Sequence, residues 1–96
     1  MTHAAPDPTP QDFPATLDTA ADRVLALLDA ADRARVAALS EADAASLNGL
    51  RFGAEVRKAC GLWRGNRPLM AACGALNPEE ASEAVILAVR ARLRGG

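Results

Sequence analysis

Large aromatic side chains are almost absent from this chain, which has two phenylalanines, one tryptophan and no tyrosine among 96 residues. Alanine, by contrast, occurs 23 times. Because alanine has the highest helix propensity and fills little volume, the composition favours closely packed helices around a thin core. A chain of this length forms one domain at most and buries only about 60–65% of its unfolded surface.

Long apolar runs are also missing. The longest, Ala84 to Val89, is far shorter than the ~20 residues that a membrane-spanning helix needs. No apolar run follows a basic start, as it would in a signal peptide. We therefore expect a cytoplasmic protein with no membrane partner.

Charge of one sign is not in excess, since the net charge is −1, and no global field attracts nucleic acid. The charge is nevertheless divided between the two halves. Residues 1–46 carry eight acids and three bases, whereas residues 47–96 carry four acids and eight bases. This division suits a polar partner, or an attraction between the halves themselves.

Cysteine and histidine are too scarce for the common metal and nucleophile chemistries. A structural zinc site uses four ligands, but the chain offers only Cys60, Cys73 and one histidine, His3, close to its N-terminus. Both cysteines are expected near helix C-termini, where the helix dipole opposes a thiolate, and we interpret them as small buried hydrophobes. No phosphate-binding glycine loop is present. The sequence thus predicts no enzyme, no metal and no cofactor.

The chain divides into a proline-rich start and a helical remainder. Residues 1–15 contain four of the six prolines and are predicted to be a disordered N-terminal tail. Apolar residues then recur with helical spacing, so residues 16–94 are predicted to be the helical domain and residues 95–96 a flexible Gly-Gly end. The expected helices cover about 17–29, 31–39, 41–60, a short segment after Asn66, and 78–94.

The segment 41–60 is predicted to be the central helix. Its apolar residues lie on two nearly opposite faces, and a helix that is apolar on both sides is buried on both sides. Gly49 and Gly53 each cost about 1 kcal/mol relative to alanine, which suggests close approach of another helix. The predicted fold is a compact all-α bundle of four to five helices with this helix central and a disordered Pro-rich N-terminal arm.

The last helix has the clearest start signal in the chain. Asn77 caps, Pro78 takes the first helical position, and Glu80 completes a capping box. Leu87 falls on the polar face of this helix, among charged residues. We expect it to be exposed or to form a contact.

The only tryptophan, Trp63, lies in a turn, within the string Cys-Gly-Leu-Trp-Arg-Gly-Asn at residues 60–66. Gly61 is predicted to end the preceding helix in a left-handed conformation, and Gly65 to adopt a positive φ. In one interpretation Trp63 folds back with Leu62 as a plug between helices, which would contribute on the order of 3 kcal/mol. In another, it stays partly exposed as a protein-binding hot spot.

The longer string LRFGAEVRKACGLWRGNRPLMAACGALNPEEAS resembles a bacterial family of domains of unknown function, number 6794 of that series. The matching positions are Leu50, Phe52, Gly53, Gly61 to Asn66, Cys73, Gly74, Pro78 and Glu79 to Ser82. The chain has Arg51 where the family pattern has histidine, and it is poorer in aromatic residues. The resemblance implies a small helical domain, and it points to no particular activity.

Our leading functional hypothesis is a non-catalytic protein-interaction module, a regulator or immunity-type partner, that binds another protein and is a possible homodimer. The candidate contact residues are Arg57, Trp63, Arg64 and Arg67, with Leu87 as a second contact. The same four residues could instead bind single-stranded nucleic acid, because an aromatic ring among bases suits stacking.

The C-terminal sequence offers a third hypothesis. It ends in Leu-Arg-Gly-Gly, which looks like the terminus of ubiquitin-like modifiers, and Arg94, Gly95 and Gly96 would form the conjugation tail. Those modifiers have a β-grasp fold, whereas this chain is predicted to be helical, and Gly95 also suits an ordinary helix C-cap.

Overall fold

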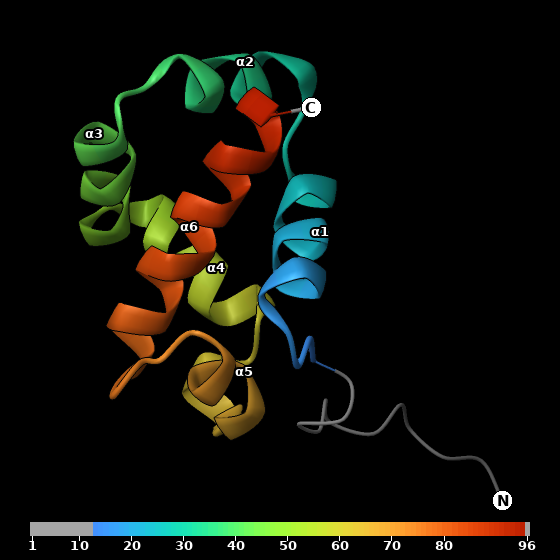
Figure 1. The fold of residues 1–96 in the computed structure, drawn as a ribbon, viewed down its shortest axis with the longest axis vertical. Coiled ribbons are helices and arrows are strands. Elements are labelled where there is room, and N and C mark those ends of the chain that lie inside the picture. The colour runs from blue at the N-terminus through green and yellow to red at the C-terminus, as the bar shows by residue number, and fades with distance from the viewer. Residues whose placement is uncertain (1–12, 96) are drawn as a thin grey trace, which may run out of the picture.

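The computed structural model describes residues 13–95, and this part of the chain is all-α, as predicted, with no strand (Figure 1). Residues 1–12, which include His3 and most of the predicted tail, and Gly96 lie outside the described residues. The elements are α1 (Leu17–Leu27), α2 (Ala30–Ala38), α3 (Glu41–Ser46), the 3₁₀ turn η2 (Leu47–Gly49), α4 (Arg51–Ala59), the 3₁₀ turn η3 (Leu62–Arg64), α5 (Arg67–Ala72) and α6 (Pro78–Gly95).

Most helices begin where a side-chain cap was expected. The Thr16 hydroxyl accepts a hydrogen bond from the Thr19 amide at the start of α1, and Ser40 caps α3 in the same way. At the start of α6 the Asn77 side chain accepts from the Glu80 amide at 2.9 Å. Each bond satisfies an amide that has no partner within its own helix.

The predicted continuous helix over 41–60 is wrong. The chain forms α3, the turn η2 and an extended Leu50 before α4 begins at Arg51. The break follows from Asn48, whose amide nitrogen donates to the Glu79 carbonyl at 2.8 Å and whose side-chain oxygen accepts from Ser82 at 2.5 Å. Gly53 does mark a close approach, but of backbone within this break, because a Cβ there would lie 2.0 Å from the Asn48 carbonyl oxygen.

The central helix is α6 instead. It packs against every other helix and both 3₁₀ turns in the described part of the chain, and Figure 1 shows it running through the middle of the molecule. One face of α6 is fully buried, through Ala81, Ser82, Val85, Ile86 and Val89. The rest of the core comes mostly from alanines, valines and two leucines of the surrounding helices, which is the thin core that the composition indicated.

Four arginines connect neighbouring helices by donating hydrogen bonds to carbonyls at the C-terminal ends of those helices. Arg90 and Arg94 of α6 donate to the Leu39 and Ala37 carbonyls at 2.7 and 2.8 Å, at the end of α2. Arg33 of α2 donates to the Leu25 carbonyl of α1 at 2.7 Å, and Arg23 of α1 to the Ala59 carbonyl of α4 at 3.4 Å. Carbonyls at the end of a helix generally lack an amide partner within it, so these arginines cap neighbouring helices. The Leu25 carbonyl also accepts from the Leu28 amide at 3.1 Å.

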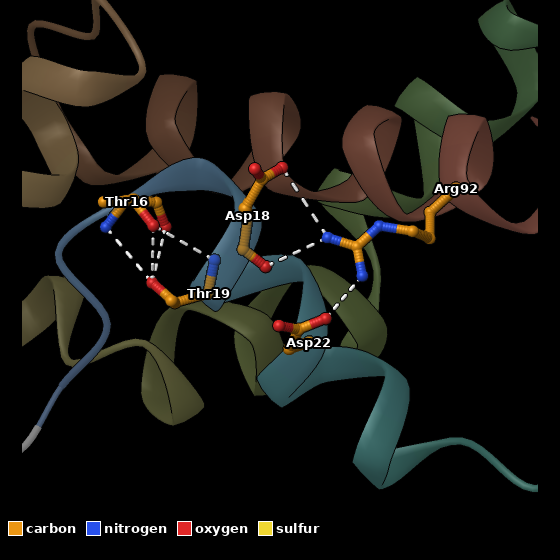
Figure 2. Close-up of polar contacts among 5 residues, drawn as sticks. All are labelled: Thr16, Asp18, Thr19, Asp22 and Arg92. Atoms are coloured by element: carbon orange, nitrogen blue, oxygen red, sulfur yellow. Dashed lines mark hydrogen bonds and ion pairs between the residues drawn. The ribbon is translucent and has the colours of Figure 1, made fainter.

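Arg92 joins α6 to α1 by ion pairs. Figure 2 shows its guanidinium between the side chains of Asp18 and Asp22, one turn apart on α1. It also donates to the Asp18 carbonyl at 3.2 Å. The hydrogen bond and the charge of Asp22 raise the pKa of Arg92, so its guanidinium stays charged at any physiological pH.

Among residues 13–95, no helix combines the length and the apolar character that crossing a membrane requires.

Candidate functional site

Residues 60–66 form a tight corner between α4 and α5. The turn η3 lies between two glycines in the left-handed region, Gly61 with φ of 67° and Gly65 with φ of 80°, as the sequence indicated. The first side chain of η3, Leu62, is 2% exposed, whereas the next, Trp63, is 60% exposed. The interpretation of Trp63 as a plug is therefore wrong, because Leu62 fills the space beneath the corner.

Asn66 holds the corner in place from within. Its side chain is fully buried, and its amide nitrogen donates to the Pro14 carbonyl at 2.8 Å and to the Cys60 carbonyl at 2.7 Å. Its oxygen accepts from the Leu69 amide at 3.3 Å, capping α5. The Asn66 side chain thus connects the segment before α1, the end of α4 and the start of α5.

The packed domain begins earlier than the predicted boundary at residue 16. Pro14 is buried, and the Phe13 ring lies on Gly61. A Cβ on Gly61 would lie 2.2 Å from Phe13 Cδ2, so only glycine leaves room for this ring. Residues 13–15, which were assigned to the tail, therefore form one edge of the corner.

Arg57 supports the Trp63 ring from below. Its guanidinium carbon lies 5.4 Å from the centre of that ring, a cation–π contact worth about 0.5–1 kcal/mol at an exposed site. The same guanidinium donates to the Asn48 carbonyl and side-chain oxygen, both at 3.2 Å, and to the Ser82 hydroxyl at 3.1 Å. The ring therefore contacts a cation that hydrogen bonds hold in place.

A shallow hollow of about 410 Å³ lies beside the tryptophan. We call its lining the corner surface, which consists of Phe13, Arg57, Lys58, Gly61, Trp63 and Arg64. Arg57, Trp63 and Arg64 were predicted from the sequence to act together, and the structure brings them together here. Arg67, the fourth predicted residue, is exposed at the start of α5 and does not line the hollow.

The corner surface carries exposed positive charge that is not held in ion pairs, and one acid, Glu55, lines an adjoining hollow with Lys58. Lys58 and Arg64 are exposed, and neither they nor Arg67 forms an ion pair within residues 13–95. Arg57 is different, because its guanidinium is directed to Asn48 and Ser82. The surface thus combines an apolar ring face with two free cationic ends and a third close by along the chain.

The remaining predicted contact residues lie elsewhere. Leu87 is half-buried on α6 and packs against the core. Arg94 donates to the Ala37 carbonyl, and Gly95 is the last residue of α6 rather than part of a flexible end. Gly96 lies outside the described residues, and the conjugation hypothesis remains a prediction that requires the last turn of α6 to unwind.

The two cysteines show no feature of a reactive thiol. Burial raises the pKa of Cys60 to about 11, and burial also raises the pKa of Cys73. Both shifts keep the thiols protonated at neutral pH, and a protonated thiol is a poor nucleophile and metal ligand. Among residues 13–95, no group of three or more His, Cys, Asp or Glu is arranged to hold a metal ion.

Two side chains of the corner surface, Phe13 and Lys58, were not among the predicted contact residues. Phe13 stands between prolines in a segment whose composition indicated disorder. No local pattern links it to Gly61, 48 residues later in the chain. Lys58 is one of the basic residues that surround Trp63 in the sequence, and in the structure it is exposed and lines the hollow beside that ring.

Comparison with known proteins identifies a family but no characterised relative. The sequence profile of the family described as "Domain of unknown function (DUF6794)" matches residues 13–93. This range begins at Phe13, so the match includes the segment that packs on the corner. Neither the curated proteins nor the solved structures contain a match to the chain.

Proposed function

The chain belongs to the DUF6794 family, and from the geometry of the corner surface we propose that it is a non-catalytic protein-interaction module. In this proposal the chain acts by binding, as a regulator or an immunity-type protein does, and the corner surface is where its partner docks. The partner presents an apolar side chain to Trp63 and carboxylates to Lys58 and Arg64.

The exposure of Trp63 carries the proposal. The adjacent Leu62 is buried in the same turn, so the corner can place a large side chain inside, yet it places the larger ring outside. Leaving so large an apolar surface in water forgoes roughly 2–3 kcal/mol of burial. A partner that covers the ring recovers this free energy, and tryptophan and arginine are the residues most enriched in binding hot spots.

The rigidity of the corner is the second support. Asn66 fixes the backbone on both sides of η3, and Arg57 supports the ring. A side chain that is held in place before binding loses little conformational entropy when a partner arrives. The free charges of Lys58 and Arg64 favour an acidic partner and increase its association rate at low salt.

The experiment uses the full chain as an affinity bait in its native host, beside the variants Trp63→Ala and Leu76→Ala. Leu76 is the matched control, because it is 87% exposed and lies outside the corner surface. We expect a partner that is retained by the wild type and by Leu76→Ala and is lost with Trp63→Ala.

Binding to the purified partner is then measured directly by fluorescence. Trp63 is the only tryptophan in the chain, so burial of its ring shifts the emission of a single known residue. A partner that binds Trp63→Ala as tightly as the wild type, or that leaves the emission of Trp63 unchanged when it carries no tryptophan of its own, would refute the proposal.

Nucleic-acid binding is the second candidate, and the same exposed ring among free cations supports it. Against it, Arg57 is engaged inside the protein, and the first turn of α6 carries Glu79 and Glu80. Titration with a single-stranded oligonucleotide at low salt decides between the two. Quenching of Trp63 that weakens steeply with added salt would favour nucleic acid, and no quenching would exclude it.

A further inference from the structure

A second hollow, of about 390 Å³, opens between α2 and α4. We call it the α2–α4 groove. Its walls are mostly apolar and include Val36 of α2, Leu39 directly after α2, Leu47 of η2, and Phe52 and Val56 of α4, with Leu27 at the edge. It shares no lining residue with the corner surface.

The groove exists because α2 is held on α6 rather than on α4. Arg90 and Arg94 of α6 bind the last carbonyls of α2, and α2 has only one buried side chain, Val36. Five of its nine residues are alanines, which are too short to reach across to α4. The space that larger side chains would fill is left open.

Leu27 makes the groove unusual for the surface of a small monomer. It is the last residue of α1, lines the groove and is 57% exposed. A leucine at the rim of an apolar groove leaves a continuous apolar surface in water, and such surfaces commonly mark contacts.

Three charged residues stand at the rim of the groove, Asp32 and Arg35 on α2 and Glu55 on α4. Arg35 is paired with Asp32 at 3.5 Å, but this pair is exposed and therefore weak. Glu55 forms no ion pair within residues 13–95. The α2 wall thus offers the guanidinium of Arg35, which is more exposed than its partner Asp32, and the α4 wall offers an anion that has no ion pair.

We propose that a second copy of this chain covers the α2–α4 groove in a two-fold symmetric dimer. A two-fold interface brings the same patch of both copies together, so the patch must complement itself. Arg35 and Glu55 meet this requirement, because they stand on opposed walls and the symmetry places Arg35 opposite Glu55 of the partner subunit twice. Arg35 then exchanges its weak, exposed pair with Asp32 for a pair across the interface. Leu27 of each copy then enters the groove of the other.

The first test measures the mass of the full chain by sedimentation equilibrium from micromolar to millimolar concentration. We expect a concentration-dependent dimer. Leu27→Gln should raise the dissociation constant about a hundredfold, because two leucines lose their burial. The control Leu76→Gln removes a leucine that is even more exposed than Leu27 and does not line the groove, and it should leave the dissociation constant unchanged.

The second test exchanges the charges at the rim. Arg35→Glu and Glu55→Arg, each alone, oppose like charges twice in the dimer and should weaken it about tenfold. Mixing the two variants restores both attractive pairs, so the mixed dimer should form with nearly wild-type affinity. Circular dichroism checks that each variant is folded.

A chain that stays monomeric at millimolar concentration would overturn the dimer, and binding of a different protein to the groove would then replace it. A dimer that Leu76→Gln weakens as much as Leu27→Gln, or that the charge variants do not restore on mixing, would place the interface elsewhere.

The two surfaces adjoin, because Leu27 and Glu55 line a third hollow together with Phe13 and Lys58 of the corner surface. Trp63 lines neither the groove nor that hollow, so Trp63→Ala should leave dimerisation unchanged and separates this inference from the proposed function.

Discussion

Replacing Asn66 by alanine should destabilise the domain more than any other single cap substitution. The change removes the cap of α5, worth about 1 kcal/mol. It also leaves the buried carbonyls of Pro14 and Cys60 without their donor, at about 1 kcal/mol or more each. We expect a loss of about 3 kcal/mol, against a total stability of roughly 5–14 kcal/mol for a chain of this size.

Asn77→Ala is the matched control for this substitution. Asn77 caps α6 through one bond, at 2.9 Å to the Glu80 amide, and its side chain is exposed, so only about 1 kcal/mol should be lost. Asn66→Asp gives a further comparison, because it keeps the cap oxygen but replaces the donor by a second oxygen that faces two carbonyls. It should be at least as destabilising as Asn66→Ala.

The free energies are measured by urea unfolding, followed in parallel by far-ultraviolet circular dichroism and by Trp63 fluorescence. Circular dichroism reports the helices, and the fluorescence reports the corner. The reasoning is refuted if Asn66→Ala costs no more than Asn77→Ala, or if Asn66→Asp is as stable as the wild type. Either result would mean that the two carbonyls find other donors.

Three further predictions concern the same region. Gly61→Ala and Gly65→Ala both place alanine at a positive φ, which costs about 1–2 kcal/mol each. Only at Gly61 does the new Cβ also meet Phe13, so urea unfolding should show the larger loss of stability for Gly61→Ala. Equal losses would contradict the contact between Phe13 and Gly61. Burial raises the pKa of Cys60 from 9.0 to about 11 in the folded protein, so its contribution to stability is complete below pH 9. That contribution is lost as the pH rises from about 9 to about 11, by up to roughly 2–3 kcal/mol. Most of the loss should disappear in Cys60→Ala, while the raised pKa of Cys73 leaves a smaller one. Trp63→Ala should cost less than about 1 kcal/mol, since it removes only an exposed cation–π contact, and a loss of 3 kcal/mol in a thermal or urea melt would show that the ring is structural after all.

The helix starts could be predicted because their signals are local. The Asn66 cap, the Ser40 cap and the Asn77–Pro78 start each depend on residues within four positions of one another, and all three appear in the structure. The two left-handed glycines of the corner follow for the same reason. Local chemistry of this kind is visible in a single sequence.

The break between α3 and α4 could not be predicted in that way. Asn48 is held by Glu79 and Ser82, which are 31 and 34 residues away, and periodicity alone favours one uninterrupted helix. The predicted approach of another helix at Gly49 and Gly53 is wrong, because nothing lies within 4 Å of a Cβ at Gly49 and the neighbour at Gly53 is the Asn48 backbone. Close approach of another helix and a break in the backbone both explain a glycine. Only the tertiary contact distinguishes them.

The candidate site was predicted in part. The grouping of Arg57, Trp63 and Arg64 follows from their spacing around a turn, but the direction of the Trp63 ring does not. It depends on Leu62 filling the interior first and on Phe13 closing over Gly61. The second of these contacts joins residues 48 positions apart, and the proline content of the N-terminal segment concealed it.

The arginine caps have a consequence for the behaviour of the domain in acid. In most proteins the charged contacts between helices involve carboxylates, which lose their charge as the pH falls below about 4. Here Arg23, Arg33, Arg90 and Arg94 bind main-chain carbonyls, which do not titrate. Acidification therefore releases the ion pairs of Arg92 with Asp18 and Asp22 but leaves the hydrogen bonds between the other four arginines and the main chain intact.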